Sequence, residues 1–293
     1  MQRTLAISEV VSAPQVIATV RERSRAPFMY NGHLLVDLTA GDAAGDGVNP
    51  WWRASSPAIF AHIASKYRAI RVRLYEIERG TYRTLIGNLA QRMPQVGFIR
   101  VHEASWIHQD TASTVEVICG DSRTLENFAD LRPYEWLFVN NDPNSMNGWA
   151  LNMTHLAEMM LQAQRYGSYI CTLSTMGCNA GGCKLVGLEH RTSWFPPIER
   201  SIGLLAEHPR LDLVLRKVVG DFNQWAYLLM VPVSKAIPRQ VGQLEVVDYS
   251  WRRNTAAFEA AICELFYSKQ QRADGHDWRS TQAGKPHHDS FSP

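Results

Sequence analysis

The stretch Leu34-Leu35-Val36-Asp37-Leu38-Thr39-Ala40-Gly41-Asp42-Ala43-Ala44-Gly45-Asp46-Gly47 decides the fold of this chain. An apolar run passes directly into small residues and glycines, which predicts a buried strand followed by a turn that admits a ligand close to the backbone. In an open α/β sheet, such a turn lies where a nucleotide-like cofactor binds. The stretch therefore predicts an α/β fold with a ligand site at the end of its first strand.

The charge of the same turn indicates the kind of ligand. A loop that cradles phosphates presents amide donors and usually a lysine, whereas this turn carries Asp37, Asp42 and Asp46 and no cation. A cation that contains adenosine, such as S-adenosylmethionine, suits this turn better than the pyrophosphate of NAD does. The alternative is that the glycines and acidic residues mark an ordinary turn.

Composition limits the class of protein. The chain has 293 residues, of which 45% are hydrophobic and 20% charged, so it is expected to be globular with a substantial core. A net charge of +2 is too small to predict nucleic acid or an anionic membrane as a partner. The five cysteines and the start Met-Gln-Arg-Thr, which lacks the apolar region of a signal peptide, predict a reducing, cytoplasmic location. No apolar run approaches the roughly 20 residues that cross a bilayer, so no membrane association is expected.

Strand and helix patterns alternate along the first two thirds of the chain, and two neighbouring strands follow. Strands are expected over 34–37, 70–76, 96–102, 114–119, 135–141, 168–173, 211–219, 224–233 and 244–247. Helices are expected over 57–64, 82–89, 125–128, 149–166, 193–208 and 255–266, with Ser56 as the cap of the first. This order predicts an α/β fold: a Rossmann-like, mostly parallel sheet that ends in an antiparallel hairpin, with helices on both faces.

The domain boundaries follow from composition. Residues 1–30 are expected to form an N-terminal arm, and residues 31–268 the α/β domain. Residues 269–293 are polar and poor in bulky apolar side chains, which is typical of a disordered tail.

The strand order and the residues at the strand ends resemble the class I S-adenosylmethionine-dependent methyltransferases, whose sheet ends in such a reversed hairpin. The resemblance spans residues 33–233 and is carried by Asp37 to Gly41, Glu76, Gly120-Asp121 and Asn140 to Pro143. It implies S-adenosylmethionine as the cofactor.

The resemblance also implies a role for each of these residues. Asp37 and Gly41 would lie beside the methionine part of the cofactor, Glu76 would accept from the ribose hydroxyls, and Asp121 would accept from the adenine amine. Thr39 and Asn140, in the same motifs, are the other cofactor-binding candidates. The alternatives are a surface carboxylate at a strand end for Glu76 and a helix N-cap for Asp121.

A second motif points to the methyl acceptor. Asn141-Asp142-Pro143-Asn144 resembles the Asp/Asn-Pro-Pro-aromatic signature of methyltransferases that act on exocyclic amines of nucleic-acid bases, after the base has left its stack. The resemblance implies that Asn141, Asp142 and Pro143 are catalytic and orient the acceptor. The second proline and the adjoining aromatic residue are absent; either Trp149 supplies the ring from the next helix or it is a core residue.

Three functions remain open at this point. The leading one is a methyltransferase that acts on nucleic acid, and another is a methyltransferase for small molecules. The rival from a different class is a catalytically inactive accessory or partner-binding protein of a virus, plasmid or defence system. A narrower resemblance, to the bacterial three-Cys-motif partner proteins, agrees with this rival and is carried by Asp37 to Gly41, Ser56-Pro57, Asp142-Pro143 and Trp149.

Other chemistries have less support. Cys171, Cys178 and Cys183 with His190 lack a close Cys-x-x-Cys pair, so no metal site is predicted. Arginines interleaved with aromatic residues could form a nucleic-acid surface or ordinary solvated faces. They are Arg68, Arg71, Arg73, Arg79, Arg83, Arg92, Arg252 and Arg253.

Overall fold

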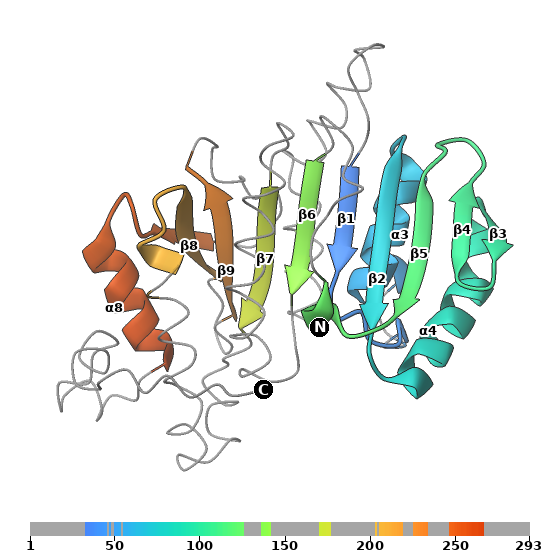
Figure 1. The fold of residues 1–293 in the computed structure, drawn as a ribbon, viewed down its shortest axis with the longest axis horizontal. Helices are drawn as coiled ribbons and strands as arrows, with labels where there is room; N and C mark the ends of the chain where they lie inside the picture. Colours follow the sequence, from blue (N-terminus) through green and yellow to red (C-terminus); the bar gives the residue numbers. More distant parts are fainter. Residues whose placement is uncertain are drawn as a thin grey trace.

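The computed structural model describes residues 33–45, 47, 50–53, 55–125, 136–141, 170–176, 203, 205–218, 225–233 and 246–266. Their strands form a 10-stranded sheet in the order β10-β8-β9-β7-β6-β1-β2-β5-β4-β3 (Figure 1). The strands are β1 (His33–Asp37), β2 (Ile70–Glu76), β3 (Phe98–His102), β4 (Ser105–His108), β5 (Thr114–Cys119), β6 (Trp136–Asn141), β7 (Ile170–Met176), β8 (Leu211–Val218), β9 (Trp225–Pro232) and β10 (Val246–Ser250).

The centre of the sheet is parallel and one end is reversed. β1 pairs in parallel with both β2 and β6, β2 with β5, and β6 with β7. β9 runs antiparallel between β7 and β8. This arrangement confirms the Rossmann-like sheet with an antiparallel hairpin that the sequence predicted.

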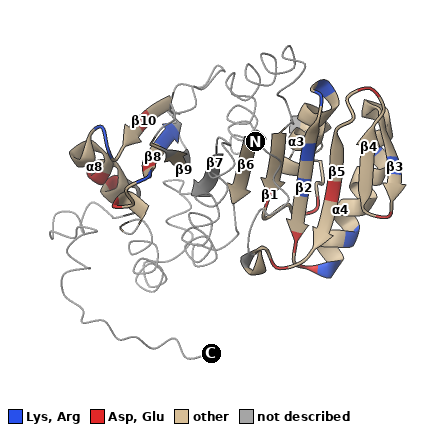
Figure 2. Ribbon diagram, turned by 45° about the horizontal axis from the view of Figure 1, so that its top comes forward, with Lys and Arg blue, Asp and Glu red and all other residues tan. Residues whose placement is uncertain are grey.

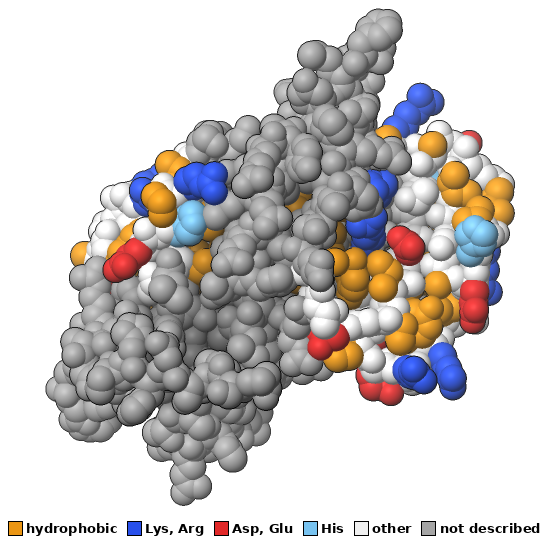
Figure 3. Space-filling view, in the orientation of Figure 1, with side chains coloured by type: hydrophobic (Ala, Val, Ile, Leu, Met, Phe, Trp, Pro, Cys, Tyr) orange, Lys and Arg blue, Asp and Glu red, His pale blue; other side chains and the backbone are white. Residues whose placement is uncertain are grey.

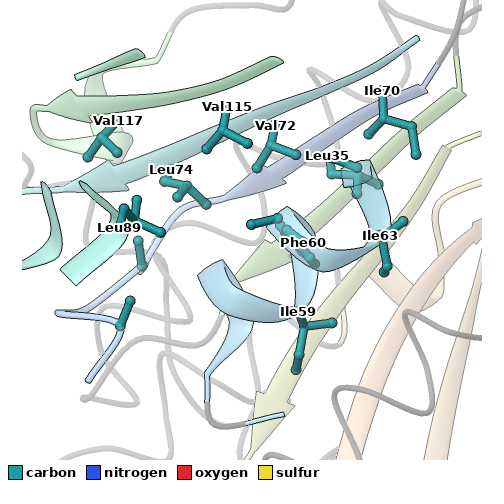
Figure 4. Close-up of a cluster of buried hydrophobic side chains, with 14 of the residues drawn as sticks. Leu35, Ile59, Phe60, Ile63, Ile70, Val72, Leu74, Leu89, Val115 and Val117 are labelled. Atoms are coloured by element: carbon teal, nitrogen blue, oxygen red, sulfur yellow. The ribbon is translucent and has the colours of Figure 1, made fainter. Parts of the chain in front are cut away.

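The hydrophobic core lies between the sheet and two helices, α3 (Ser56–Lys66) and α4 (Arg79–Arg92). Ile59, Phe60 and Ile63 of α3 belong to the same cluster of buried side chains as Leu35 of β1 and Val72 of β2 (Figure 4). β1 is buried along its whole length, as expected of a central strand covered on both faces. This packing fixes the position of the end of β1, where the glycine turn begins.

A third helix, α8 (Thr255–Phe266), packs against β8 and β10 at one end of the sheet. Val214 of β8 belongs to the same apolar cluster as Phe60 of α3. Lys217 points to the opposite side of β8 because the side chains of a strand alternate, and it pairs with Glu264 of α8 at 2.5 Å. Helices therefore lie on both faces, as predicted.

The start of α3 differs by one residue from the prediction. The helix already includes Ser56, and its N-cap is Ser55, which makes no side-chain capping hydrogen bond. Pro57 occupies the first turn, where its missing N–H has no helical partner to lose. The proline correctly predicted that a helix begins here, but it did not show which of the two adjacent serines is the N-cap.

The hairpin beside β5 was only half predicted. β4 was missed, and the strand expected over 96–102 pairs with β4, which in turn pairs with β5. Trp106 is the buried anchor of β4, but its neighbours are polar or exposed, so no clear alternation marks the strand. The helix expected over 125–128 falls, except for Leu125, on residues 126–135, which lie outside the described part; a short 3-10 helix, η3 (Ser122–Thr124), ends just before Leu125. Two further 3-10 helices are η1 (Trp51–Arg53) and η2 (Met93–Val96).

The sheet face opposite α3 carries exposed side chains around its β3–β4 hairpin. Hydrophobic side chains gather there (Figure 3), among them Ile99, Val101 and Ile107. A basic band on β2 lies beside an acidic one on β5 (Figure 2), where Arg73 pairs with Glu116 at 3.8 Å. Of the described helices, none is long and apolar enough to span a membrane.

Candidate functional site

The carboxyl ends of the central parallel strands lie at one edge of the sheet. Asp37 ends β1, and its register partners are Leu74 near the end of β2 and Asn140 near the end of β6. The chain moves outward from β1 through β2 to β5 and then returns to β6 on the other side of β1. Ligands of open α/β sheets bind beside the strand ends where the strand order reverses in this way, so the β1–β6 junction is the candidate site.

The Asp37 carboxylate joins the two strands at this junction. Its Oδ1 accepts from the backbone N–H of Thr39 at 3.1 Å and from Nδ2 of Asn140 at 3.1 Å. Both side chains are buried, with 0% of Asp37 and 1% of Asn140 exposed. The structure therefore brings together three of the predicted cofactor residues.

The other half of the Asn140 amide is unsatisfied. Its Oδ1 is buried and has no hydrogen-bond partner among the described residues. A buried acceptor without a partner is uncommon, and at a ligand edge it is a point where a donor group of a ligand is accommodated. The protonated amino group of an amino acid would be such a donor.

Glu76 fastens the glycine turn to the end of β2. Its Oε2 accepts from the backbone N–H of Gly41 at 3.0 Å, and its Oε1 accepts from the N–H of Glu78 at 2.9 Å. Ala40 adds a backbone hydrogen bond to the carbonyl of Tyr75 at 3.0 Å. Each carboxylate oxygen can accept a second hydrogen bond, so the acceptor role proposed for Glu76 toward a ribose is compatible with these contacts.

The turn itself has the left-handed backbone that glycine allows. Gly41 has φ of +66°, and Ala43 has φ of +53°, which is uncommon for a residue with a Cβ. Two side chains hold this half of the turn: Asn88 Nδ2 donates to the Asp42 carbonyl at 2.8 Å, and Trp51 Nε1 donates to the Ala43 carbonyl at 3.3 Å. The turn is thus tied to α4 and to η1.

These contacts bear on the ligand's charge. The Gly41 N–H is directed at a carboxylate, and the Ala44 N–H donates to Asp42 Oδ1 at 2.8 Å. Two backbone N–H groups that would otherwise be available to bind a phosphate therefore already donate to carboxylates. The electrostatics of the turn favour a cationic or neutral ligand over a pyrophosphate.

The remaining predicted residues are less completely placed. Gly120 donates its N–H to the Glu76 carbonyl at 3.0 Å, which sets Asp121 beside the end of β2. The Asp121 carbonyl accepts from the N–H of Thr124 at 3.0 Å and so begins η3. Asn141 ends β6 and is buried.

Several residues that were singled out from the sequence lie outside the described part of the chain. Asp142, Pro143, Asn144 and Trp149 lie outside the described residues. Cys178, Cys183 and His190 do so too, and no metal-binding group of three or more His, Cys, Asp or Glu occurs in the described part of the chain.

Sequence reasoning missed Asn88 and Trp51. Asn88 lies on the half-buried side of an amphipathic helix, and its contact with the turn joins residues far apart in the chain, so no local pattern marks it. Trp51 follows the turn closely, and an aromatic residue with an N–H donor just after a glycine turn was a usable signal.

Comparison with known proteins adds similarity to solved methyltransferase structures at low identity. Human methyltransferase 10 domain containing protein is 12% identical, with 75% of this chain and 80% of that chain covered and a TM-score of 0.35. A SAM-dependent methyltransferase from Methanosarcina mazei is 10% identical, with 71% and 95% covered and a TM-score of 0.40. The METTL16 methyltransferase domain is 10% identical, with 74% and 82% covered and a TM-score of 0.36.

No family model and no curated protein sequence matches the chain. At these identities and TM-scores, the solved structures carry no argument about function. The strand order with its reversed β9 is the arrangement that the resemblance to class I methyltransferases implied. The chain has a class I methyltransferase-like fold.

Proposed function

We propose that this protein binds S-adenosylmethionine at the β1–β6 junction and transfers its methyl group to an acceptor. The observation that carries the proposal is the set of acidic and amide side chains at the ends of β1, β2 and β6, namely Asp37, Glu76 and Asn140, around a turn whose Gly41 N–H donates to a carboxylate. An acidic surrounding stabilises a sulfonium cation and repels a pyrophosphate.

The residues divide the binding task between them. The unpartnered Asn140 Oδ1 would accept from the amino group of the methionine part. Glu76, with lone pairs left on both oxygens, would accept from the ribose hydroxyls, and Asp121 from the adenine amine. The cofactor, when bound, supplies an electrophilic methyl group on a positively charged sulfur.

The protein's contribution to the reaction is then mostly geometric. Holding an acceptor in line with the methyl group converts a bimolecular reaction into an effectively unimolecular one. Asn141, at the end of β6, together with Asp142 and the Pro143 carbonyl, would orient the acceptor. The cofactor would leave as S-adenosylhomocysteine and the methylated amine would lose its proton to water, so the residues at the β1–β6 junction need not carry it.

Nucleic acid is the acceptor class that we propose. Its support is the Asn141-Asp142-Pro143 motif, which resembles the signature of amine methylation on bases, and the arginines of β2 and its flanks. The ion pair between Arg73 and Glu116 weakens the second argument, because it neutralises part of that basic surface.

Calorimetric titration tests the cofactor proposal. We expect S-adenosylmethionine and S-adenosylhomocysteine to bind, and NAD to bind at least tenfold more weakly or not at all. A folded protein that binds none of them, or that prefers NAD, would overturn the proposal.

The acceptor is tested by transfer of a tritiated methyl group to DNA, RNA, protein and small-molecule pools. Transfer to nucleic acid, with an affinity that falls steeply as salt is raised, is the expected result. Transfer only to small molecules would favour the small-molecule alternative.

The non-catalytic alternative has a specific basis in the sequence. Asn144 stands where the amine-methylating signature has its second proline, and no aromatic residue adjoins it. If cofactor binds but no label reaches any acceptor, a partner-binding role on the same scaffold is favoured.

A further inference from the structure

Two side chains that the proposed function does not use, Trp51 and Asn88, hold the glycine turn from outside, and Asn88 does so from α4. Asn88, on α4, donates from Nδ2 to the carbonyl oxygen of Asp42 at 2.8 Å. Asp42 stands between Gly41 and Ala43, which both have positive φ. The bond therefore holds the central peptide of the turn.

This bond acts together with the Glu76 contact. A rotation of the Asp42–Ala43 peptide would turn the Asp42 carbonyl away from Asn88. The same rotation would relieve the unfavourable positive φ of Ala43, so it would lower the backbone strain of the turn. The Gly41 N–H, which donates to Glu76 Oε2 at 3.0 Å, lies two peptide groups before the Asp42 carbonyl, so Asn88 restrains the segment that follows this contact. Asn88 therefore opposes a relaxation of the turn next to the residue that Glu76 holds.

We propose that Asn88 is a positioning residue for the nucleoside site: it keeps the glycine turn in the shape that holds Glu76 in place. This proposal rests on the proposed function. Asn88 itself would not touch the cofactor; it acts through Asp42, Gly41 and Glu76.

Asn88 is not needed to hold α4 in place. The helix packs on the core through Leu85, Ile86 and Leu89, which are buried, and its N-terminus is capped by Glu78. The side chain of Asn88 is only half-buried and is not in the apolar cluster. Its removal should therefore loosen the turn without unfolding the helix.

The test compares Asn88→Ala with Gln91→Ala, an exposed position one turn further along the same helix. We expect Asn88→Ala to raise the Kd for S-adenosylhomocysteine about three- to tenfold, as loss of one partly exposed hydrogen bond implies, with little change in Tm. Gln91→Ala should leave the Kd unchanged. Asn88→Gln, which keeps a carboxamide donor on a longer stem, should recover part of the affinity.

Hydrogen exchange gives a second readout that needs no ligand. Amides of residues 38–44 should exchange faster in Asn88→Ala than in the unmodified protein or in Gln91→Ala, while those of β2 stay unchanged. Equal exchange in all three proteins, or a Kd that does not respond to Asn88→Ala, would overturn the proposal. If the unmodified protein binds no nucleoside, the proposed function fails, and unchanged exchange would still show separately that Asn88 does not hold the turn.

Discussion

At the scale of single residues, Asp37 combines an acidic side chain with full burial at the end of β1. Its carboxylate is fully buried and accepts from one backbone amide and one side-chain amide, which together link β1 to β6. A buried carboxylate without donors is strongly unfavourable, and a buried donor without an acceptor is also costly. Asp37 and Asn140 are therefore coupled, and neither is expected to tolerate replacement alone.

Asp37→Ala should lower the free energy of unfolding by about 2–3 kcal/mol, because it leaves the Thr39 N–H and the Asn140 Nδ2 without an acceptor. Urea unfolding measures the loss. The control, Asp110→Ala at an exposed loop position, should stay within about 0.5 kcal/mol of the unmodified protein. A loss of similar size in both variants would contradict the role given to Asp37.

The residue scale is also where sequence reasoning stopped. Asp37, Gly41 and Glu76 were predicted as cofactor-binding residues because they lie at or just after the expected ends of strands. That Glu76 accepts from Gly41 could not be predicted, because the bond joins residues that are 35 positions apart in the chain. Asn88 gave no signal, since a lone polar residue on a helix face is ordinary.

At the scale of elements, periodic segments were predicted most accurately. The predicted bounds of β2, β5 and α8 are those of the structure, because each has alternating or helical apolar spacing over its whole length. β4 was missed because it is short and has few apolar residues. The local pattern of apolar residues is thus sufficient to predict long elements. It is insufficient to predict a short hairpin strand that is anchored by one buried tryptophan.

Two glycines near α4 should respond oppositely to the same substitution. Gly97 follows η2 with φ of +87°, and a Cβ there would lie 2.7 Å from Nε2 of the buried His108. Gly97→Ala should therefore destabilise the protein by about 2–4 kcal/mol, from backbone strain and overpacking.

Gly87, inside α4, has open space around its Cα, so Gly87→Ala should stabilise by about 0.5–1 kcal/mol. Thermal unfolding of both variants checks the signs, and destabilisation by Gly87→Ala would contradict this account of α4.

The N-cap of α4 should make stability depend on pH. Hydrogen bonds from the backbone amides of Thr81 and Gly80 lower the pKa of the Glu78 carboxyl below its ordinary value of 4.5. A lowered pKa in the folded state means that the carboxylate stabilises the fold above pH 4.5, and that this contribution is lost as the pH falls through the folded-state pKa.

Glu78→Gln removes that titration. We expect the free energy of unfolding of the unmodified protein to exceed that of the variant above pH 4.5, and the difference to shrink below it. Urea midpoints at a series of pH values check this, with Glu207→Gln, at an exposed glutamate outside α4, as the control. A difference that does not change with pH would contradict the capping role.

At the scale of the whole molecule, the sheet is finished by β10 and α8 at the end far from the β3–β4 hairpin. β10 pairs only with β8 among the described strands, so backbone hydrogen bonds hold it on one side alone. Side chains supply the rest: Asp212 accepts from Ser250 Oγ at 2.7 Å and from the Arg252 N–H at 3.2 Å. The sequence predicted a short strand and a helix here, but not the polar contacts that attach them.

The strongest of these attachments is the pair of Arg216 on β8 and Asp248 on β10. Nε and Nη2 of Arg216 donate to the two carboxylate oxygens at 2.7 and 2.8 Å, and only 1% of the arginine side chain is exposed. Such a two-bond pair is geometrically specific as well as strong. Since 31% of the Asp248 side chain is exposed, water can reach the carboxylate when the arginine is removed.

We therefore expect Arg216→Ala to cost about 2–3 kcal/mol, less than the loss of a partner from a fully buried pair. Arg253→Ala, at an exposed position between β10 and α8, is the matched control and should change stability by less than about 0.5 kcal/mol. Because the pair attaches the outermost strand, proteolysis under native conditions should cut Arg216→Ala first within residues 246–266, while the β1–β6 junction stays protected. Cleavage that begins equally throughout the sheet would mean that Arg216 supports the whole fold rather than its last strand, and the attachment proposed for β10 would then be wrong.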